Sequence, residues 1–104
     1  MKMLGLSEKS FDTLQGAIAA SRGVVRAKVF GSRAKGCNRE GSDIDLCLYV
    51  DDSFSVKDKL NLIRKFEEST LPYKVDVLVF TELENESLKE HIEQVGVTVY
   101  ERTN

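Results

Sequence analysis

The sequence of 104 residues contains no tryptophan, one proline, one histidine and two cysteines. Cys37 lies in a polar stretch and Cys47 in an apolar one, so we expect no disulfide between them and no disulfide framework. No cluster of cysteine and histidine accompanies either residue, which argues against a zinc site of that kind. Thiols without a disulfide fit a reducing compartment, and we expect a cytoplasmic protein.

Long apolar runs are also missing. No stretch approaches the ~18 apolar residues of a membrane span, and the first residues lack the apolar core of a signal peptide. The net charge of −2 gives no general attraction to nucleic acid or to anionic membranes, so neither is expected as a partner. The length predicts one domain, residues 1–104.

Positive charge is nevertheless concentrated in one region of this weakly acidic chain. Residues 22–41 contain one acidic residue, Glu40, and six basic ones: Arg22, Arg26, Lys28, Arg33, Lys35 and Arg39. Such a local positive field suits an anionic ligand such as a phosphate, although some of these side chains are expected simply to be solvated.

Apolar periodicity predicts helices and strands in alternation. Helical spacing covers residues 8–22 and 56–70, and Asn85 is a suitable N-cap for a third helix. Val56, Leu60, Ile63 and Phe66 form the predicted buried stripe of the second of these helices. Strands are predicted at 24–30, 43–50, 74–80 and 97–101. The expected fold is α/β, with a small mixed sheet of about four strands flanked by helices.

A Gly-Ser pair and two aspartates frame the basic loop. Gly31 allows backbone to approach a phosphate closely, and the Ser32 hydroxyl can donate a hydrogen bond to it. A short helix beginning near Ser32 would turn its first amides toward the phosphates. Asp43 and Asp45 are two residues apart at the start of an apolar run, so in a strand they share one face. Adjacent carboxylates repel each other unless a cation lies between them, and beside phosphates that cation is Mg2+.

The order Gly-Ser, ten residues, Asp-x-Asp resembles the signature of the DNA polymerase beta-like nucleotidyltransferase superfamily. The short chain is similar to the minimal nucleotidyltransferases, the antitoxin halves of HEPN/MNT pairs. That resemblance implies a nucleotidyltransferase palm and transfer of a nucleotidyl group from ATP to a hydroxyl. A tight turn followed by a solvated strand edge would explain either half of the signature alone.

The resemblance also implies roles for particular residues. Asp43 and Asp45 would bind two magnesium ions, and Asp76 would complete the second metal site and accept the hydroxyl proton. The nucleotide-binding residues would be Gly31, Ser32, Arg33 and Ser42. Apart from the resemblance, Asp76 lies within an apolar run, where a charge is costly unless it is paired, protonated or metal-bound. A partly exposed ion pair with Lys74 is the alternative.

Larger superfamily members bind the acceptor with a second domain, and 104 residues leave no room for one here. The acceptor-binding surface is therefore expected to come from outside the chain. A partner protein or another copy of the chain would have to supply that surface. The resemblance implies a HEPN-domain toxin as partner, a toxin tyrosine as the acceptor of AMP, and an antitoxin role. Two alternatives remain open: a small-molecule nucleotidyltransferase of the antibiotic-modifying kind, and a binding module that blocks the toxin without catalysis.

Overall fold

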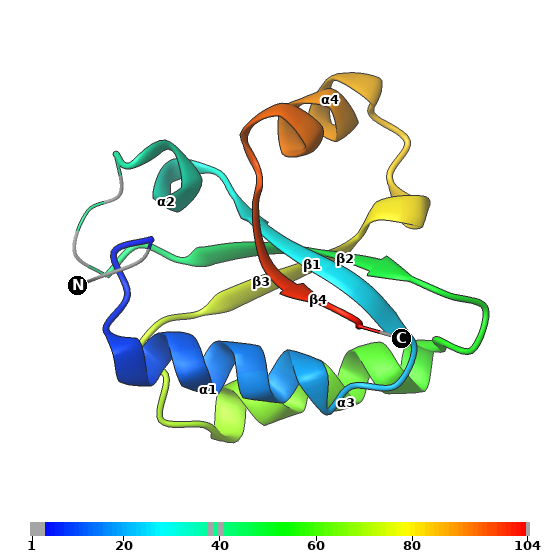
Figure 1. Cartoon of the computed structure of the whole chain (residues 1–104), viewed down its shortest axis with the longest axis horizontal. Helices are drawn as coiled ribbons and strands as arrows, with labels where there is room; N and C mark the ends of the chain where they lie inside the picture. Colours follow the sequence, from blue (N-terminus) through cyan, green and yellow to red (C-terminus); the bar gives the residue numbers. More distant parts are fainter. Residues whose placement is uncertain (1–3, 38, 40, 104) are drawn as a thin grey trace.

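The computed structural model describes residues 4–37, 39 and 41–103. Within them, four strands alternate with helices, and a short 3-10 helix follows the third strand (Figure 1). In chain order the elements are α1 Glu8–Ala19, β1 Val24–Phe30, α2 Ser32–Lys35, β2 Ile44–Val50, α3 Val56–Glu68, β3 Val75–Val79, η1 Phe80–Glu82, α4 Glu86–Val95 and β4 Val97–Glu101.

The strands form one sheet in the order β3-β2-β1-β4. Strand β1 runs antiparallel to both of its neighbours, β2 and β4. Strand β3 runs parallel to β2, and α3 makes the crossover that a parallel pair requires. The predicted mixed sheet of four strands is therefore confirmed.

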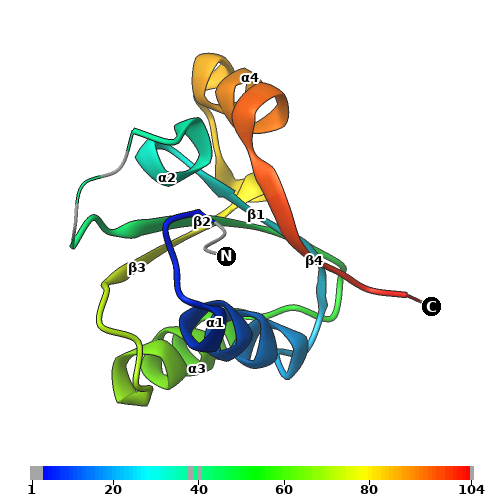
Figure 2. The same ribbon diagram turned by 60° about the vertical axis from the view of Figure 1, so that its left-hand side comes forward.

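Helices cover the two faces of the sheet unequally. Helices α1 and α3 lie side by side against one face, whereas α2 and α4 stand on the other (Figure 2). The larger apolar cluster fills the space between the sheet and α1 and α3. A smaller cluster around Phe30, Cys47 and Ile92 lies beneath α4. No helix among the described residues is long and apolar enough to cross a membrane.

Element ends differ from the predictions by a few residues, for local reasons. Helix α3 ends at Glu68 rather than near residue 70, because Ser69 is already extended. The Ser69 hydroxyl donates to the carbonyl of Phe66 and accepts the amide of Leu71, which turns the chain out of the helix. Strand β3 is shorter than predicted, because Phe80 begins the 3-10 helix η1, which the apolar pattern did not predict.

The predicted buried stripe of α3 was wrong in its first half. Val56 and Leu60 are 70% and 55% exposed, whereas Leu62 and Phe66 are buried. Helix α3 begins with a capping box, in which the Ser55 side chain accepts the Asp58 amide and the Asp58 carboxylate accepts the Ser55 amide. Helix α3 therefore has one apolar stripe with Val56 and Leu60, which is exposed, and another with Leu62 and Phe66, which is buried. The helical period alone did not indicate which of the two stripes packs on the sheet.

Candidate active site

The turn between β1 and α2 places backbone directly against a carboxylate. Gly31 ends the strand with φ 74° and ψ −151°, a conformation essentially restricted to glycine. A Cβ atom at this position would collide with Oδ2 of Asp45 and lie 3.2 Å from its Cγ. Glycine is therefore required twice, by its backbone conformation and by the space that Asp45 occupies.

Two of the predicted catalytic carboxylates are direct neighbours across the sheet. Asp45 in β2 and Asp76 in β3 are paired positions of the parallel ladder, so their side chains leave the same face. This is the face that carries α4, because Cys47, two residues after Asp45, packs with Ile92 of that helix. Asp43 lies two residues before Asp45, just ahead of the strand, and is exposed.

The three carboxylates share one negative field. Burial raises the pKa of Asp45 above its ordinary value of 3.8, and the negative charges of Asp76 and then Asp43 raise it further. A carboxylate that is repelled by two others is stabilised in its charged form by a cation. The site therefore favours a positively charged ligand.

In this structure the three carboxylates are not gathered into a single set of metal ligands. Among the described residues, no group of three or more His, Cys, Asp and Glu side chains is arranged to hold a metal ion. Asp76 instead pairs with Lys74, with 3.5 Å between Nζ and Oδ1, and 45% of its side chain is exposed. The positive charge of Lys74 offsets part of the repulsion between Asp76 and Asp45. The sequence had indicated this ion pair as the alternative for Asp76.

Arg33, a predicted nucleotide-binding residue, is buried and its guanidinium is held by backbone carbonyls and an aromatic ring. It is only 3% exposed, and its guanidinium donates to the carbonyls of Leu4 and Ser42 at 2.6–3.2 Å. The same group stacks over the Tyr73 ring, 4.4 Å from its centroid. In this structure Arg33 connects α2 to the residue preceding Asp43, a role that the sequence did not reveal.

The two serines take different positions around the loop. Ser32 begins α2 and is half-buried beside Gly31. The Ser42 hydroxyl accepts the backbone amide of Arg39 at 2.8 Å, while the Ser42 carbonyl accepts the Arg33 guanidinium. Ser42 therefore has a structural task in fixing the approach to Asp43.

Behind the carboxylates, a polar cluster fixes α4 on the sheet. Lys28 is 8% exposed, with its Nζ 3.4 Å from the Glu93 carboxylate, which also accepts the Tyr49 hydroxyl at 3.0 Å. Burial and this hydrogen bond raise the pKa of Tyr49, and burial raises the pKa of Cys47 to about 12. Both groups stay protonated near neutral pH and are structural. Sequence reasoning missed the cluster, because Glu93 is remote from Lys28 along the chain.

A mixed sheet with a glycine turn packed on one of two paired strand carboxylates defines the nucleotidyltransferase class of α/β domain. Residues 13–104 match the family described as "Polymerase beta, Nucleotidyltransferase". The chain belongs to this family.

Individual relatives place the chain among the small members. It is 34% identical over 73 residues to a probable protein adenylyltransferase, MntA, of Haemophilus influenzae. That similarity covers 70% of this chain and 63% of the relative, so the chain spans less than two thirds of that protein's length. Among solved structures, one assigned as a minimal nucleotidyltransferase superposes with a TM-score of 0.73 at 27% identity, over 92% of this chain and 95% of the other.

A further structure shares the fold at lower identity. The complex of a tri-AMPylated Shewanella oneidensis HEPN toxin with an MNT antitoxin contains a chain with a TM-score of 0.68 and 15% identity. The superposition covers 93% of this chain and 74% of that one. These structures confirm the expected nucleotidyltransferase palm.

Proposed function

We propose that this chain is a magnesium-dependent protein adenylyltransferase that acts as an antitoxin. In this proposal the chain transfers AMP from ATP to the hydroxyl group of a tyrosine on a HEPN-domain toxin. The observation that carries the proposal is the packing of the Gly31 turn against Asp45, whose neighbour across the ladder is Asp76. The similarity to MntA and to a chain bound to an AMPylated HEPN toxin supports the choice of acceptor.

The donor atoms fit magnesium. Asp43, Asp45 and Asp76 offer hard carboxylate oxygens, and their mutual repulsion favours a divalent cation between them. We propose that these three carboxylates would hold two magnesium ions, with Asp76 released from its ion pair with Lys74. When bound, the ions supply neutralisation of the charge that develops on the reacting phosphate.

The residues of the chain then have separate tasks. The Gly31 backbone and the Ser32 hydroxyl hold the β- and γ-phosphates of ATP. Asp76 accepts the proton of the attacking hydroxyl, which forms a bond to the α-phosphorus while the bond to the β-phosphate oxygen breaks. Pyrophosphate leaves, and AMP remains on the acceptor oxygen. Positioning and charge neutralisation are the main contributions that a protein makes to such a reaction.

Arg33 contributes indirectly in this scheme. Because its guanidinium is held by Leu4, Ser42 and Tyr73, it is not available to a phosphate in this arrangement. We propose that it fixes the loop between α2 and Asp43, so that the phosphate turn and the carboxylates keep their spacing. Ser42 belongs to the same support.

The acceptor surface belongs to a partner in this proposal. The described residues form one sheet with helices on its two faces, and we propose that the surface that binds the acceptor is supplied by the partner. A reducing compartment such as the cytoplasm suits the two free thiols, the exposed Cys37 and the buried Cys47.

Label transfer from ATP tests the proposal. ATP labelled at the α-phosphate should label the cognate HEPN protein in the presence of magnesium, whereas ATP labelled at the γ-phosphate should not. The double variant Asp43→Asn with Asp45→Asn should lose the labelling. Neutralisation of the toxin by the double variant without labelling would favour a pure binding module. Labelling of an aminoglycoside-like alcohol alone would favour a small-molecule enzyme.

A further inference from the structure

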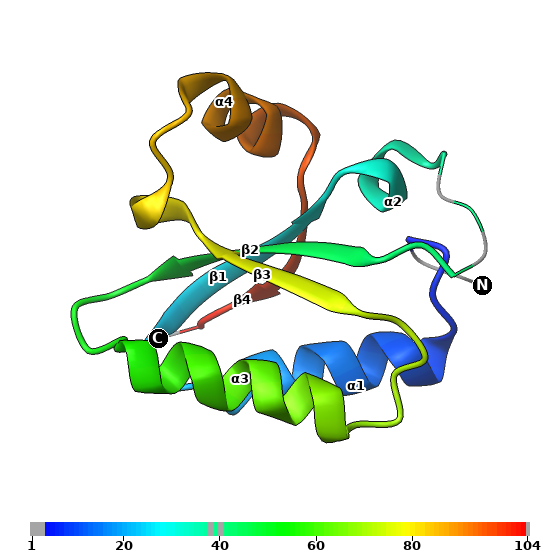
Figure 3. The same cartoon turned by 180° about the vertical axis from the view of Figure 1, so that it is seen from behind.

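Strand β3 forms an open edge of the sheet. It is bonded to β2 on one side, and no further strand among the described residues follows it (Figure 3). The Ile44 amide donates to the Lys74 carbonyl, so the backbone groups of Lys74 face β2. Because these groups alternate along a strand, those of Asp76 face β2 as well, and those of Val75 and Val77 face outward. The outward groups can pair with one more strand.

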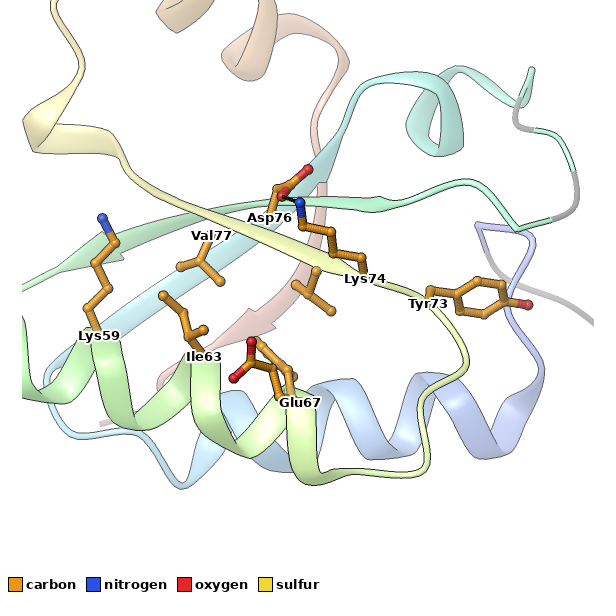
Figure 4. A pocket seen from close by; sticks show the side chains of 9 residues that line it. Lys59, Ile63, Glu67, Tyr73, Lys74, Asp76 and Val77 are labelled. Atoms are coloured by element: carbon orange, nitrogen blue, oxygen red, sulfur yellow. Dashed lines mark ion pairs between the residues drawn. The ribbon is translucent and has the colours of Figure 1, made fainter.

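A groove runs below this edge, between β3 and α3 (Figure 4). It has a volume of about 360 Å³, and its apolar lining comes from both elements. Ile63 and Phe66 contribute from α3, and Val75 and Val77 contribute from β3. An extended segment placed beside β3 would direct every second side chain into this groove.

The apolar surface continues along α3 beyond the groove. Val56 and Leu60 lie one turn apart on this helix and are 70% and 55% exposed. Within the described residues, these two are the large apolar side chains that are exposed. Lys59 and Ile63 line the groove, and Leu60 lies between them in the sequence, next to Lys59 and three positions before Ile63. The groove and this stripe thus form one surface, which is where a partner would gain apolar burial.

The other rim of the groove carries the catalytic face. Asp76 lines the groove and belongs to the active site, and it pairs with Lys74, whose side chain is 72% exposed. In Figure 4 both charged groups rise on the side of the strand away from Ile63 and Val77. A carboxylate on an added strand would attract Lys74 and release Asp76. This charge relationship favours an acidic residue in the occupant.

The opposite edge of the sheet lacks these properties. At β4 the Val99 carbonyl accepts a hydrogen bond from the Gln15 side chain of α1 at 2.8 Å. That bond protects part of the edge from an additional strand. Strand β3 is therefore the edge that is both open and adjacent to the carboxylates.

We propose that an extended segment of the acceptor protein docks as an additional strand on β3. Its alternate apolar side chains fill the groove and reach Leu60, and a carboxylate on its other face binds Lys74. The hydroxyl to be modified follows on that same face, beside Asp76. The proposal rests on the function proposed above, and it adds the route by which the acceptor reaches the site. Strand addition supplies affinity through the backbone and specificity through alternate side chains.

Binding of the cognate HEPN protein to matched variants tests the surface. Leu60→Glu should raise the Kd at least about tenfold, the loss typical of an apolar contact at the centre of an interface. Asn61→Glu introduces the same charge at the next residue, which faces a different groove beside α1, and should leave the Kd unchanged. Both positions are exposed, so both variants should fold. Lys74→Glu should weaken binding too, because it repels the proposed carboxylate.

Hydrogen exchange measured by NMR tests the strand addition itself. The amides of Val75 and Val77 should exchange rapidly in the free chain and become protected when the partner is added. The amides of Asp76 and Leu78 face β2, so they should be protected in both states and serve as the internal control. Protection of Val75 and Val77 that depends on chain concentration, without any partner, would overturn the proposal in favour of self-association.

The outcomes separate this inference from the proposed function. If the HEPN protein binds with the predicted protection but receives no AMP, the transferase proposal fails and the docking surface stands. If AMP is transferred while Leu60→Glu binds as tightly as Asn61→Glu and the two amides stay unprotected, the docking surface is overturned. Absence of any binding to the HEPN protein overturns both.

Discussion

The Cα atom of Gly31 lies so close to the carboxylate of Asp45 that no side chain fits between them. This contact joins the turn that follows β1 to the second strand of the sheet, and it places the proposed phosphate site beside the proposed metal site.

Replacing Gly31 with alanine should destabilise the fold and abolish nucleotide binding. The backbone conformation alone costs about 1–3 kcal/mol for a residue with a side chain. Gly16→Ala is the matched control, because a Cβ there meets nothing within 4 Å and lies in helix α1. It should stabilise the chain by up to about 1 kcal/mol. Urea unfolding of both variants measures the difference, and equal effects at the two glycines would contradict the geometry at Gly31.

The charge of Asp45 should reduce stability near neutral pH. Burial, Asp76 and Asp43 raise the pKa of Asp45 in the folded chain above 3.8. The folded state therefore binds the proton more tightly than the unfolded state, so the free energy of unfolding falls as the pH rises from about 3.8 through the raised pKa. Asp45→Asn lacks this titration and should be the more stable protein at neutral pH.

Denaturant unfolding at a series of pH values checks this sign. The stability difference between Asp45→Asn and the parent should shrink as the pH falls through the raised pKa of Asp45 and below 3.8, where the carboxyl becomes protonated in both the folded and the unfolded chain. A parent that is the more stable of the two at neutral pH in a magnesium-free buffer would contradict the repulsion between Asp45 and its neighbours.

Arg33→Lys should loosen the connection between α2 and Asp43. A lysine lacks the planar guanidinium fork that bonds Leu4 and Ser42 through three nitrogens and lies over the Tyr73 ring. Loss of these buried hydrogen bonds should cost about 1–3 kcal/mol of stability. The magnesium concentration needed for half-maximal activity should also rise, which a purely global loss of stability would not produce.

Lys35→Arg serves as the control for that change, because Lys35 is exposed at the end of the same short helix. It should alter neither stability nor the magnesium requirement. If Arg33→Lys instead raised the KM for ATP with stability unchanged, direct contact with phosphate would replace the supporting role of Arg33.

Much of the fold followed from the sequence, because its signals are local. Alternation and caps located the strands and helices, and the parallel placement of the third strand brought Asp76 next to Asp45. The burial of Arg33 could not be foreseen, since it depends on Tyr73 and Leu4, which are distant in the sequence. The exposed side of α3 was likewise missed, because Val56 and Leu60 continue the helical period equally well on a face that the sheet does not cover.

The carboxylate site was predicted in composition but not in geometry. Spacing predicted that Asp43 and Asp45 share one face of a strand, and in the structure Asp43 lies just before β2, which begins at Ile44. The apolar run around Asp76 indicated a charge that needs a partner. The sequence could not decide which partner that charge takes, because Lys74 and the other carboxylates compete for it. In the structure Asp76 pairs with Lys74 and lies beside Asp45.

Intact mass spectrometry of the HEPN partner tests the central claim most directly. After incubation with the parent chain, ATP and magnesium, the partner should gain whole AMP units, located on a tyrosine. Asp76→Asn should retain nucleotide binding and transfer AMP about 10²–10⁴-fold more slowly, as expected for a lost general base. An unmodified partner, or a partner modified equally fast by the Asp76→Asn chain, would contradict the account.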